Sequence, residues 1–489
     1  MRHLRFSFIL IGCFIFLSVT ANSFNYTKQW ERIAAFESKS RPQSALQAVD
    51  SLMNAAKTEK NSPQFLKGWL YRFRFLMEKD RDSFISEIGA MEKYTATDKN
   101  PVEKAVLHSL LAKLYEQYYQ QHRYTINQRT KLTAEIPTDI KEWSINIFAD
   151  TIVYHVKASL ANATLLQSTN ALRYEAIMET GADSRTLQPT LFDFLCVRSI
   201  ETLSAFSDNA QIDNQELNDH KLFEPATKFI LQTETGSTYK GKILSIYRQW
   251  LAFRLKTNNK AALIYTDLER LNYILRNATV ARKDDLYLNA LQQLRQEYST
   301  SEGVVEVMAA IANYYLQHDE YDKERVNETA RFLDYKKRAF DICAEGIQRF
   351  PKYKRINLLK AIQQQITERT IKAENPEVIA SKSPLKIKLS SANVSQMEIR
   401  LYRIDVDAVD YYKNQQRAYR NQISKGAVLT ETQKIALKPS PFFRETDTTI
   451  VVKTPPYGIY EYCVSEPGIA NPDKQVCGKF SVSDLAYFT

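Results

Sequence analysis

Glycine, cysteine and long apolar runs are scarce in this chain. Only 12 of its 489 residues are glycine, which argues against glycine-rich phosphate loops and favours long helices. The five cysteines include no Cys-x-x-Cys pair, so a zinc ribbon or a thioredoxin-type redox centre has no support. Beyond the N-terminus no apolar run reaches the roughly 20 residues that cross a bilayer, so no membrane-spanning segment is expected in the mature chain.

Motifs that carry catalysis are also missing. The sequence has no Gly-Lys-Ser/Thr, Gly-x-Gly-x-x-Gly, Gly-x-Ser-x-Gly or His-Glu-x-x-His pattern, and its six histidines show no metal-ligand spacing. His108 and His155 fall on helical stretches and are interpreted as packed or surface histidines. Asp405 and Asp407 alternate at a strand end, where turn solvation explains them better than a calcium site. We therefore expect a protein that is not an enzyme and that holds no cofactor or metal.

Length and charge set the broad class. A chain of 489 residues exceeds one hydrophobic core and predicts two to four domains, and 28 Tyr with 24 Phe supply the apolar surface. The formal net charge is +10, but Lys and Arg are interspersed with Asp and Glu throughout. This pattern is typical of a solvated surface, so no nucleic-acid partner is expected.

The N-terminus indicates export. Arg2, His3 and Arg5 form a short basic segment, residues 6–19 are almost entirely apolar, and small residues follow. This is the pattern of a secretory signal peptide, which we assign to residues 1–21. The protein is therefore predicted to be exported.

Cys13 offers a second interpretation of the same segment. It follows Leu10, Ile11 and Gly12 as in a lipoprotein box, so lipidation would attach the protein to a membrane. The apolar run continues past Cys13, whereas it should end before a lipoprotein cleavage point. The signal peptide is therefore preferred, and membrane association is expected only if Cys13 is lipidated.

One stretch, from Pro101 to Thr130, carries the clearest helical pattern. Its apolar residues recur at i, i+3, i+4 and i+7, which places them on one face of a helix. They are Leu107, Leu110, Leu111, Leu114, Tyr115, Tyr118 and Tyr119. A polar run at residues 120–123 ends this stripe, and residues 124–130 are predicted to be extended. A helix so apolar on one side needs neighbours, which predicts a packed helical array.

The end of this stripe is the candidate contact rim. It comprises Tyr118, Tyr119, His122, Arg123 and Tyr124, whose rings and guanidinium could stack against a ligand or a sugar. The alternative is a core stripe that runs out to a wetted edge, and this alternative is favoured.

Further helices of about 15 residues alternate with short polar turns through residue 372. The predicted helices span residues 26–38, 44–60, 64–79, 139–161, 240–256, 261–275, 285–298, 303–317, 335–350 and 355–370, and Pro189 opens another. Residues 303–350 look like a degenerate tetratricopeptide repeat, with small Ala positions, a Tyr pair and a terminal Phe-Pro. Residues 22–372 are therefore predicted to form a tetratricopeptide-like α-solenoid.

The pattern changes after residue 372. Residues 373–384 carry Pro and Ser punctuation and are assigned as a linker, and from Leu385 the apolar period becomes two. Short strands separated by turns predict one antiparallel β-sandwich over residues 385–489, with a helical insertion at residues 409–420. The fold class is thus mainly α with a C-terminal all-β domain, an immunoglobulin-like β-sandwich.

Two of the cysteines lie in this last region. Cys463 and Cys477 flank a turn-rich segment in two adjacent predicted strands, so a disulfide between them suits an oxidising compartment. Cys196 and Cys343 fall on apolar helix faces and are interpreted as buried thiols.

Several phrases, in order, resemble one family. The segments AVLHSLLAKLYEQYYQQHRYTINQRT, WSINIFADTIVYHVKASL and QPTLFDFLCVRSI resemble the helical N-terminal region of large bacterial α-2-macroglobulin-like proteins. MEIRLYRID, YGIYEYCVSEPG and KFSVSDLAYF are similar to the first macroglobulin-type β-sandwich of that family. The resemblance implies an exported protein of the periplasm or cell envelope of a bacterium, related to protease traps. Its protein partner would be a protease or the remaining macroglobulin domains.

The chain also departs from that family. Members are several times longer, and the thioester signature Cys-Gly-Glu-Gln is absent, since Cys477-Gly478 continues with Lys479. No bait-like segment is present, so we expect a truncated or split member and carry over no functional residue. One rival interpretation is a helical-repeat envelope scaffold or a glycan-binding protein unrelated to proteases. Another is a glycan hydrolase with unrecognised carboxylates.

Overall fold

The computed structural model describes residues 24–79, 81–130, 136–179, 181, 183–210, 217–233, 238–404, 423, 426–469 and 474–484. The chain divides into two compact units. The first comprises Met1–Gln215 with Thr233–Phe253, and the second comprises Glu216–Gln232 with Arg254–Thr489. The predicted signal peptide, Cys13, the Asp405 and Asp407 pair and the predicted helical insertion at residues 409–420 lie outside the described residues.

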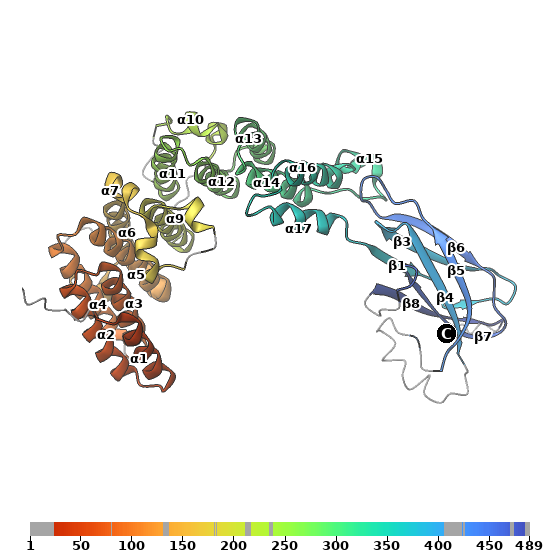
Figure 1. The fold of residues 1–489 in the computed structure, drawn as a ribbon, viewed down its shortest axis with the longest axis horizontal. Coiled ribbons are helices and arrows are strands. Elements are labelled where there is room, and N and C mark those ends of the chain that lie inside the picture. The colour runs from red at the N-terminus through yellow and green to blue at the C-terminus, as the bar shows by residue number, and fades with distance from the viewer. Residues whose placement is uncertain are drawn as a thin grey trace, which may run out of the picture. The chain divides into compact units, whose positions relative to one another are not determined.

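The predicted fold class is confirmed. Helices fill the chain up to residue 366, and strands follow from residue 370 (Figure 1). Apolar residues at helical spacing account for the helices, and apolar residues at every second position account for the strands, because burial of one face drives both.

Helices are the regular elements of the first unit among the residues described. Its α-helices are α1 (Tyr26–Ser38), α2 (Pro42–Thr58), α3 (Ser62–Lys79), α4 (Arg81–Thr97), α5 (Pro101–Asn127), α6 (Ile145–Leu160), α7 (Ala163–Ser168), α8 (Ser184–Leu187), α9 (Leu191–Ala210) and nearly all of α11 (Tyr239–Leu255). From α1 to α6 each helix packs against the next, and α5 and α6 also pack against α9. Pro42 and Pro101 occupy the first turn of α2 and α5, where the missing N–H costs nothing.

The end of α5 corrects one prediction. Residues 124–130 were expected to be extended, yet α5 continues through Asn127. Ile126 lies seven residues after Tyr119 on the same helix face and is fully buried. The hydroxyl of Tyr119 donates to Asn127 Oδ1 at 2.9 Å. These tertiary contacts extend the helix past the polar run that the local pattern marked as its end.

Helices of the second unit precede its β-domain. They are α10 (Ala226–Phe229), α12 (Lys260–Asn277), α13 (Lys283–Glu297), α14 (Val304–Gln317), α15 (Val326–Thr329), α16 (Tyr335–Arg349) and α17 (Asn357–Ile366). Helix α14 packs against α12, α13, α16 and α17. Gly346 on α16 faces the side chains of Leu359 and Met308 so closely that an added Cβ would overlap Leu359, so a glycine is needed where these helices meet.

Two sheets form the β-domain. The strands are β1 (Thr370–Glu374), β2 (Val378–Ile379), β3 (Leu385–Ala392), β4 (Gln396–Ile404), β5 (Val428–Ala436), β6 (Thr446–Val452), β7 (Gly458–Ser465) and β8 (Gln475–Val482). One sheet has the order β1-β3-β6 and the other β2-β8-β7-β4-β5. Alternate residues such as Leu385, Ile387 and Leu389 of β3 enter a shared core with Met397, Ile399 and Tyr462. Residues 370–374 and 378–379 are strands, where the sequence predicted the helical end and a linker.

The disulfide between Cys463 and Cys477 is present. The two residues are directly opposite each other in the antiparallel β7–β8 pair, with Cα atoms 4.1 Å apart. Cys196 and Cys343 are buried thiols, as predicted. Among the described helices, none is long and apolar enough to cross a membrane.

Candidate functional site

The predicted contact rim on α5 does not form one surface. Tyr118 and Tyr119 are buried, with Tyr118 stacked on Phe148 at 5.8 Å. Burial raises the pKa of Tyr119. Tyr124 is 76% exposed, and the Arg123 guanidinium lies 5.1 Å from its ring. The geometry agrees with a core stripe that runs out to a wetted edge.

A different site emerges in the second unit, where one arginine of the β-domain reaches the helices. Arg444 lies just before β6, and its guanidinium makes a bidentate ion pair with Asp319 at 2.6 and 2.7 Å. The same side chain donates to the backbone carbonyls of Leu333, at 3.0 Å, and Phe332. The Arg444 and Asp319 side chains are only 8% and 9% exposed. The planar fork of arginine explains how one side chain can serve a carboxylate and two carbonyls together.

An aromatic ring covers the outer side of this arginine. The Arg444 guanidinium carbon lies 4.6 Å from the ring centroid of Tyr321, within cation–π range. Phe443, next to it in sequence, packs against Phe340 of α16 with ring centroids 4.7 Å apart. The helices and the sandwich are therefore joined by a buried polar pair and by apolar contacts beside it.

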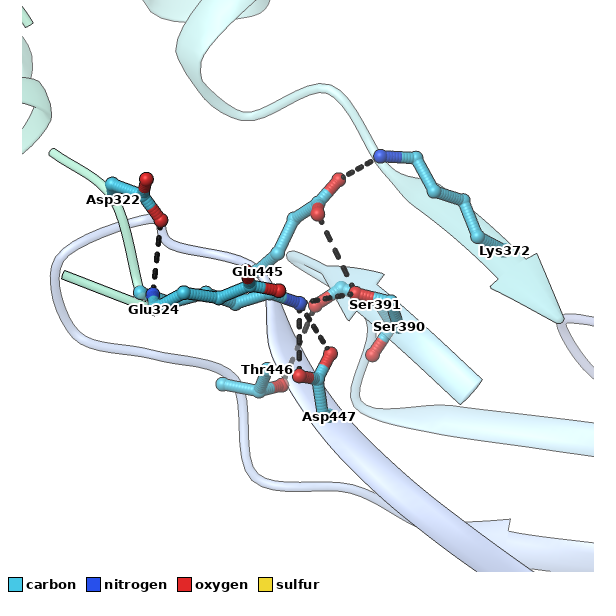
Figure 2. Close-up of polar contacts among 9 residues, drawn as sticks. Asp322, Glu324, Lys372, Ser390, Ser391, Glu445, Thr446 and Asp447 are labelled. Atoms are coloured by element: carbon cyan, nitrogen blue, oxygen red, sulfur yellow. Dashed lines mark hydrogen bonds and ion pairs between the residues drawn. The ribbon is translucent and has the colours of Figure 1, made fainter. Parts of the chain in front are cut away.

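A second, more exposed set of ion pairs flanks the first. Lys323 Nζ lies 2.7 and 2.8 Å from the carboxylate oxygens of Asp447, and Lys372 Nζ lies 2.6 Å from Glu445 Oε1 (Figure 2). Ser390 of β3 contacts both sets, at 3.4 Å from Lys323 Nζ and 3.4 Å from Glu445 Oε2. Hydrogen bonding to Lys323 lowers the pKa of Asp447, and that to Lys372 lowers the pKa of Glu445. Solvent screens these pairs, so each adds little stability.

The loop between α14 and α16 is organised by Asp322. Its Oδ1 accepts the backbone N–H of Glu324 at 2.9 Å (Figure 2). Its Oδ2 accepts from Arg325 Nε at 3.0 Å. The hydroxyl of Thr329 accepts the Asp322 N–H at 3.1 Å. The backbone bond from Glu324, followed by Arg325, lowers the pKa of Asp322. Such local bonds fix the segment that precedes α15 and tie it to Thr329, the last residue of that short helix.

A cavity of about 700 Å³ lies between this loop and the residues before β6. Acidic, basic and aromatic side chains line it: Asp319, Glu320, Tyr321, Asp322, Lys323, Arg325, Glu328, Arg331, Phe332, Lys336, Arg444 and Glu445. Its volume lies within the roughly 300–1,000 Å³ of ligand pockets, and its charged lining suits a polar group rather than an apolar ligand. We call this cavity the joint cavity.

Sequence reasoning did not find these residues. Arg444 and Asp319 are 125 positions apart, and nothing local links them. The available signal was the run Pro441-Phe442-Phe443-Arg444, in which two aromatic residues and an arginine come shortly before a strand.

Comparisons with known proteins identify no family. No protein-family model matches the chain, and no curated protein matches it. Among solved structures, a CARDB domain from Pyrococcus furiosus in complex with di-metal ions is 12% identical, covers 24% of this chain and 88% of its own, and has a TM-score of 0.15. The alkylpurine DNA glycosylase AlkC of Pseudomonas fluorescens, bound to DNA with an abasic-site analogue, is 8% identical, covers 94% and 97%, and has a TM-score of 0.15. Neither likeness supports an argument about this chain.

Proposed function

We propose that this protein is an exported, non-enzymatic binding or scaffold module, related to the bacterial α-2-macroglobulin-like proteins, that holds a protein partner at the joint cavity. The observation that carries the proposal is the buried Arg444–Asp319 pair, which fixes helices and sandwich together beside an open, charged cavity. A frame of this kind presents a preformed surface, and preformed surfaces lose less entropy on binding.

The state of the charged side chains favours binding over catalysis. Asp319, Asp322 and Glu445 are each held by a cation, and hydrogen bonding keeps Asp322 and Glu445 ionised through lowered pKa values. A general acid at neutral pH needs the opposite shift. These carboxylates therefore serve as fixed charges around the cavity.

Export is supported by the disulfide and by the N-terminal sequence. A bond between Cys463 and Cys477 persists in oxidising compartments and is rare in the bacterial cytosol. The basic and apolar pattern of residues 1–21 fits a signal peptide. The proposed location is the periplasm or cell envelope, with a membrane anchor only if Cys13 is lipidated.

The order of the two regions supports the choice of partner. A helical region followed by a sandwich, with the sequence phrases in the same order, matches what the macroglobulin resemblance implies. The proposed partner is a protease or a chain that carries the remaining macroglobulin domains. The alternative is a helical-repeat envelope scaffold or a glycan-binding protein with no link to proteases.

Site-specific photo-crosslinking tests the proposal. A photoreactive amino acid replaces Lys336, which lines the joint cavity, in the tagged full chain expressed in its native host. The matched control places it at the neighbouring Lys337, which pairs with Asp341 and does not line the cavity. Crosslinked products are identified by mass spectrometry after separation of periplasm, membranes and cytosol.

The outcomes separate the candidates. A product at position 336 but not at 337 that contains macroglobulin-type domains or a protease supports the proposal. A product with an envelope protein of another kind, or with a glycan, favours the alternative. Retention of the chain in the cytosol, or equal products at both positions, would overturn the proposal.

A further inference from the structure

Two histidines face each other inside the first unit. His108 of α5 and His155 of α6 have their Nδ1 atoms 2.9 Å apart, and the residues are 7% and 1% exposed. His155 Nε2 lies 2.9 Å from Glu92 Oε1 of α4. The Tyr115 hydroxyl donates to that same oxygen at 2.9 Å. One short chain of polar contacts thus ties three helices together, with both histidines buried and the Glu92 side chain 35% exposed.

The sequence predicted packed or surface histidines at both positions, and the structure places both in the core. Aromatic rings enclose them. The Tyr115 ring stacks on the His155 ring, with centroids 5.6 Å apart, and on the Trp143 ring, with centroids 5.5 Å apart. The Tyr154 ring meets His108 edge-on at 5.9 Å. Little water can reach the pair to solvate additional charge.

Proton counting limits the states that this arrangement accepts. A hydrogen bond between two Nδ1 atoms needs one proton between them, and the contact with Glu92 needs a proton on His155 Nε2. A neutral pair satisfies both requirements, and so does a pair with one positive charge balanced by Glu92. A pair with two positive charges places two N–H donors against each other, so the bond breaks.

The charged groups around the two histidines set the pH at which the hydrogen bond between them breaks. Burial first, and then the charge on His155, lower the pKa of His108 to about 4, and Lys104 of α5 acts in the same direction. Glu92 of α4 opposes them. The hydrogen bond and charge of His155 keep the pKa of Glu92 low in spite of burial. Burial raises the pKa of Tyr115, so this residue remains a neutral donor.

We propose that His108 and His155 form an acid-operated latch, which holds α4, α5 and α6 together at neutral pH and opens when both imidazoles become charged. Opening separates the two Nδ1 atoms and loosens the α5–α6 contact, while the disulfide-bonded sandwich is unaffected. The first unit would therefore open reversibly in acid and close again at neutral pH.

Hydrogen–deuterium exchange of the full chain tests the latch. Exchange of α5 and α6 amides, corrected for the intrinsic pH dependence, is measured at pH 7, 5 and 4. Because His108 titrates near pH 4 in the folded protein and near 6.5 when exposed, the opening constant should rise about 20-fold at pH 5 and about 100-fold at pH 4. In His108→Gln, which cannot take up a proton, the rise should fall below about fivefold.

A matched control and a second measurement keep the result interpretable. His220 is an exposed histidine, so His220→Gln should leave the wild-type profile unchanged. An equal acid response in wild type and His108→Gln would overturn the proposal. Should His108→Gln fail to fold, imidazole titration of the wild-type chain by NMR decides the matter. A buried histidine that titrates below pH 5 supports the latch, and titration of both histidines near 6.5 overturns it.

Discussion

Replacement of Arg444 with methionine tests the joint between helices and sandwich directly. Methionine keeps most of the length and apolar volume but removes all the donors. Asp319 would then stay buried without its cation, and the carbonyls of Phe332 and Leu333 would lose their donor. Breaking a buried pair from one side costs roughly 3–5 kcal/mol, so we expect a loss of about 4 kcal/mol. That is a large share of the 5–15 kcal/mol typical of a folded domain.

Two further variants test whether the stability loss of Arg444→Met comes from the buried ion pair. Asp319→Leu combined with Arg444→Met removes both charges, so the double variant should recover about 1–2 kcal/mol relative to Arg444→Met alone. Lys337→Met removes one partner of the exposed Lys337–Asp341 pair and should cost less than about 1 kcal/mol.

Urea unfolding followed by circular dichroism gives the free energies. Hydrogen–deuterium exchange shows where the chain opens, and we expect the increase in residues 330–335 and 444–447. A loss below about 1 kcal/mol for Arg444→Met, equal to that of the exposed control, would refute the argument that this pair joins the two parts.

Three other predictions concern helix packing, the disulfide and histidine titration. Gly346→Ala should lower the free energy of unfolding by about 1–3 kcal/mol, because the added Cβ overlaps Leu359 of α17. Gly89→Ala has open space around it and should raise the free energy of unfolding by up to about 1 kcal/mol. Thermal unfolding of both variants checks this prediction. Reduction of Cys463–Cys477, which closes a loop of 14 positions, should cost about 3 kcal/mol, measured by urea unfolding with and without dithiothreitol. His108 has a pKa lowered from 6.5 to about 4, so the unfolded chain binds more protons, and about 3 kcal/mol of stability present above pH 6.5 should disappear as the pH falls to 4. Parallel urea titrations of wild type and His108→Gln isolate that contribution.

The spacing of apolar residues in the sequence correctly predicted the helices and strands that bury one face. Helix α1 spans Tyr26–Ser38, as its apolar spacing predicts, and β3 alternates between buried and exposed residues as its period of two requires. Both patterns exist because burial selects apolar residues at positions that the backbone geometry fixes.

The spacing of apolar residues did not predict strands that lack a buried apolar face. Strand β5 (Val428–Ala436) was not predicted, because it pairs only with β4 among the described strands and its residues are mostly exposed. Its backbone bonds to β4 hold it in place, and these leave no periodic trace in the sequence. Strand β1 was likewise missed. Residue 370 was predicted to end a helix and residues 373–374 to belong to a linker, whereas pairing with β3 makes residues 370–374 a strand.

The amino-acid order alone determined the class of fold, most helix positions, the two buried thiols and the disulfide, since each rests on spacing between near neighbours. Only the tertiary structure decided the joint cavity and the histidine latch. Arg444 meets Asp319 across 125 positions, and His108 meets His155 across 47. Such meetings depend on how whole helices and sheets pack, and a carboxylate or an imidazole looks the same in sequence whether it is buried beside a partner or surrounded by water.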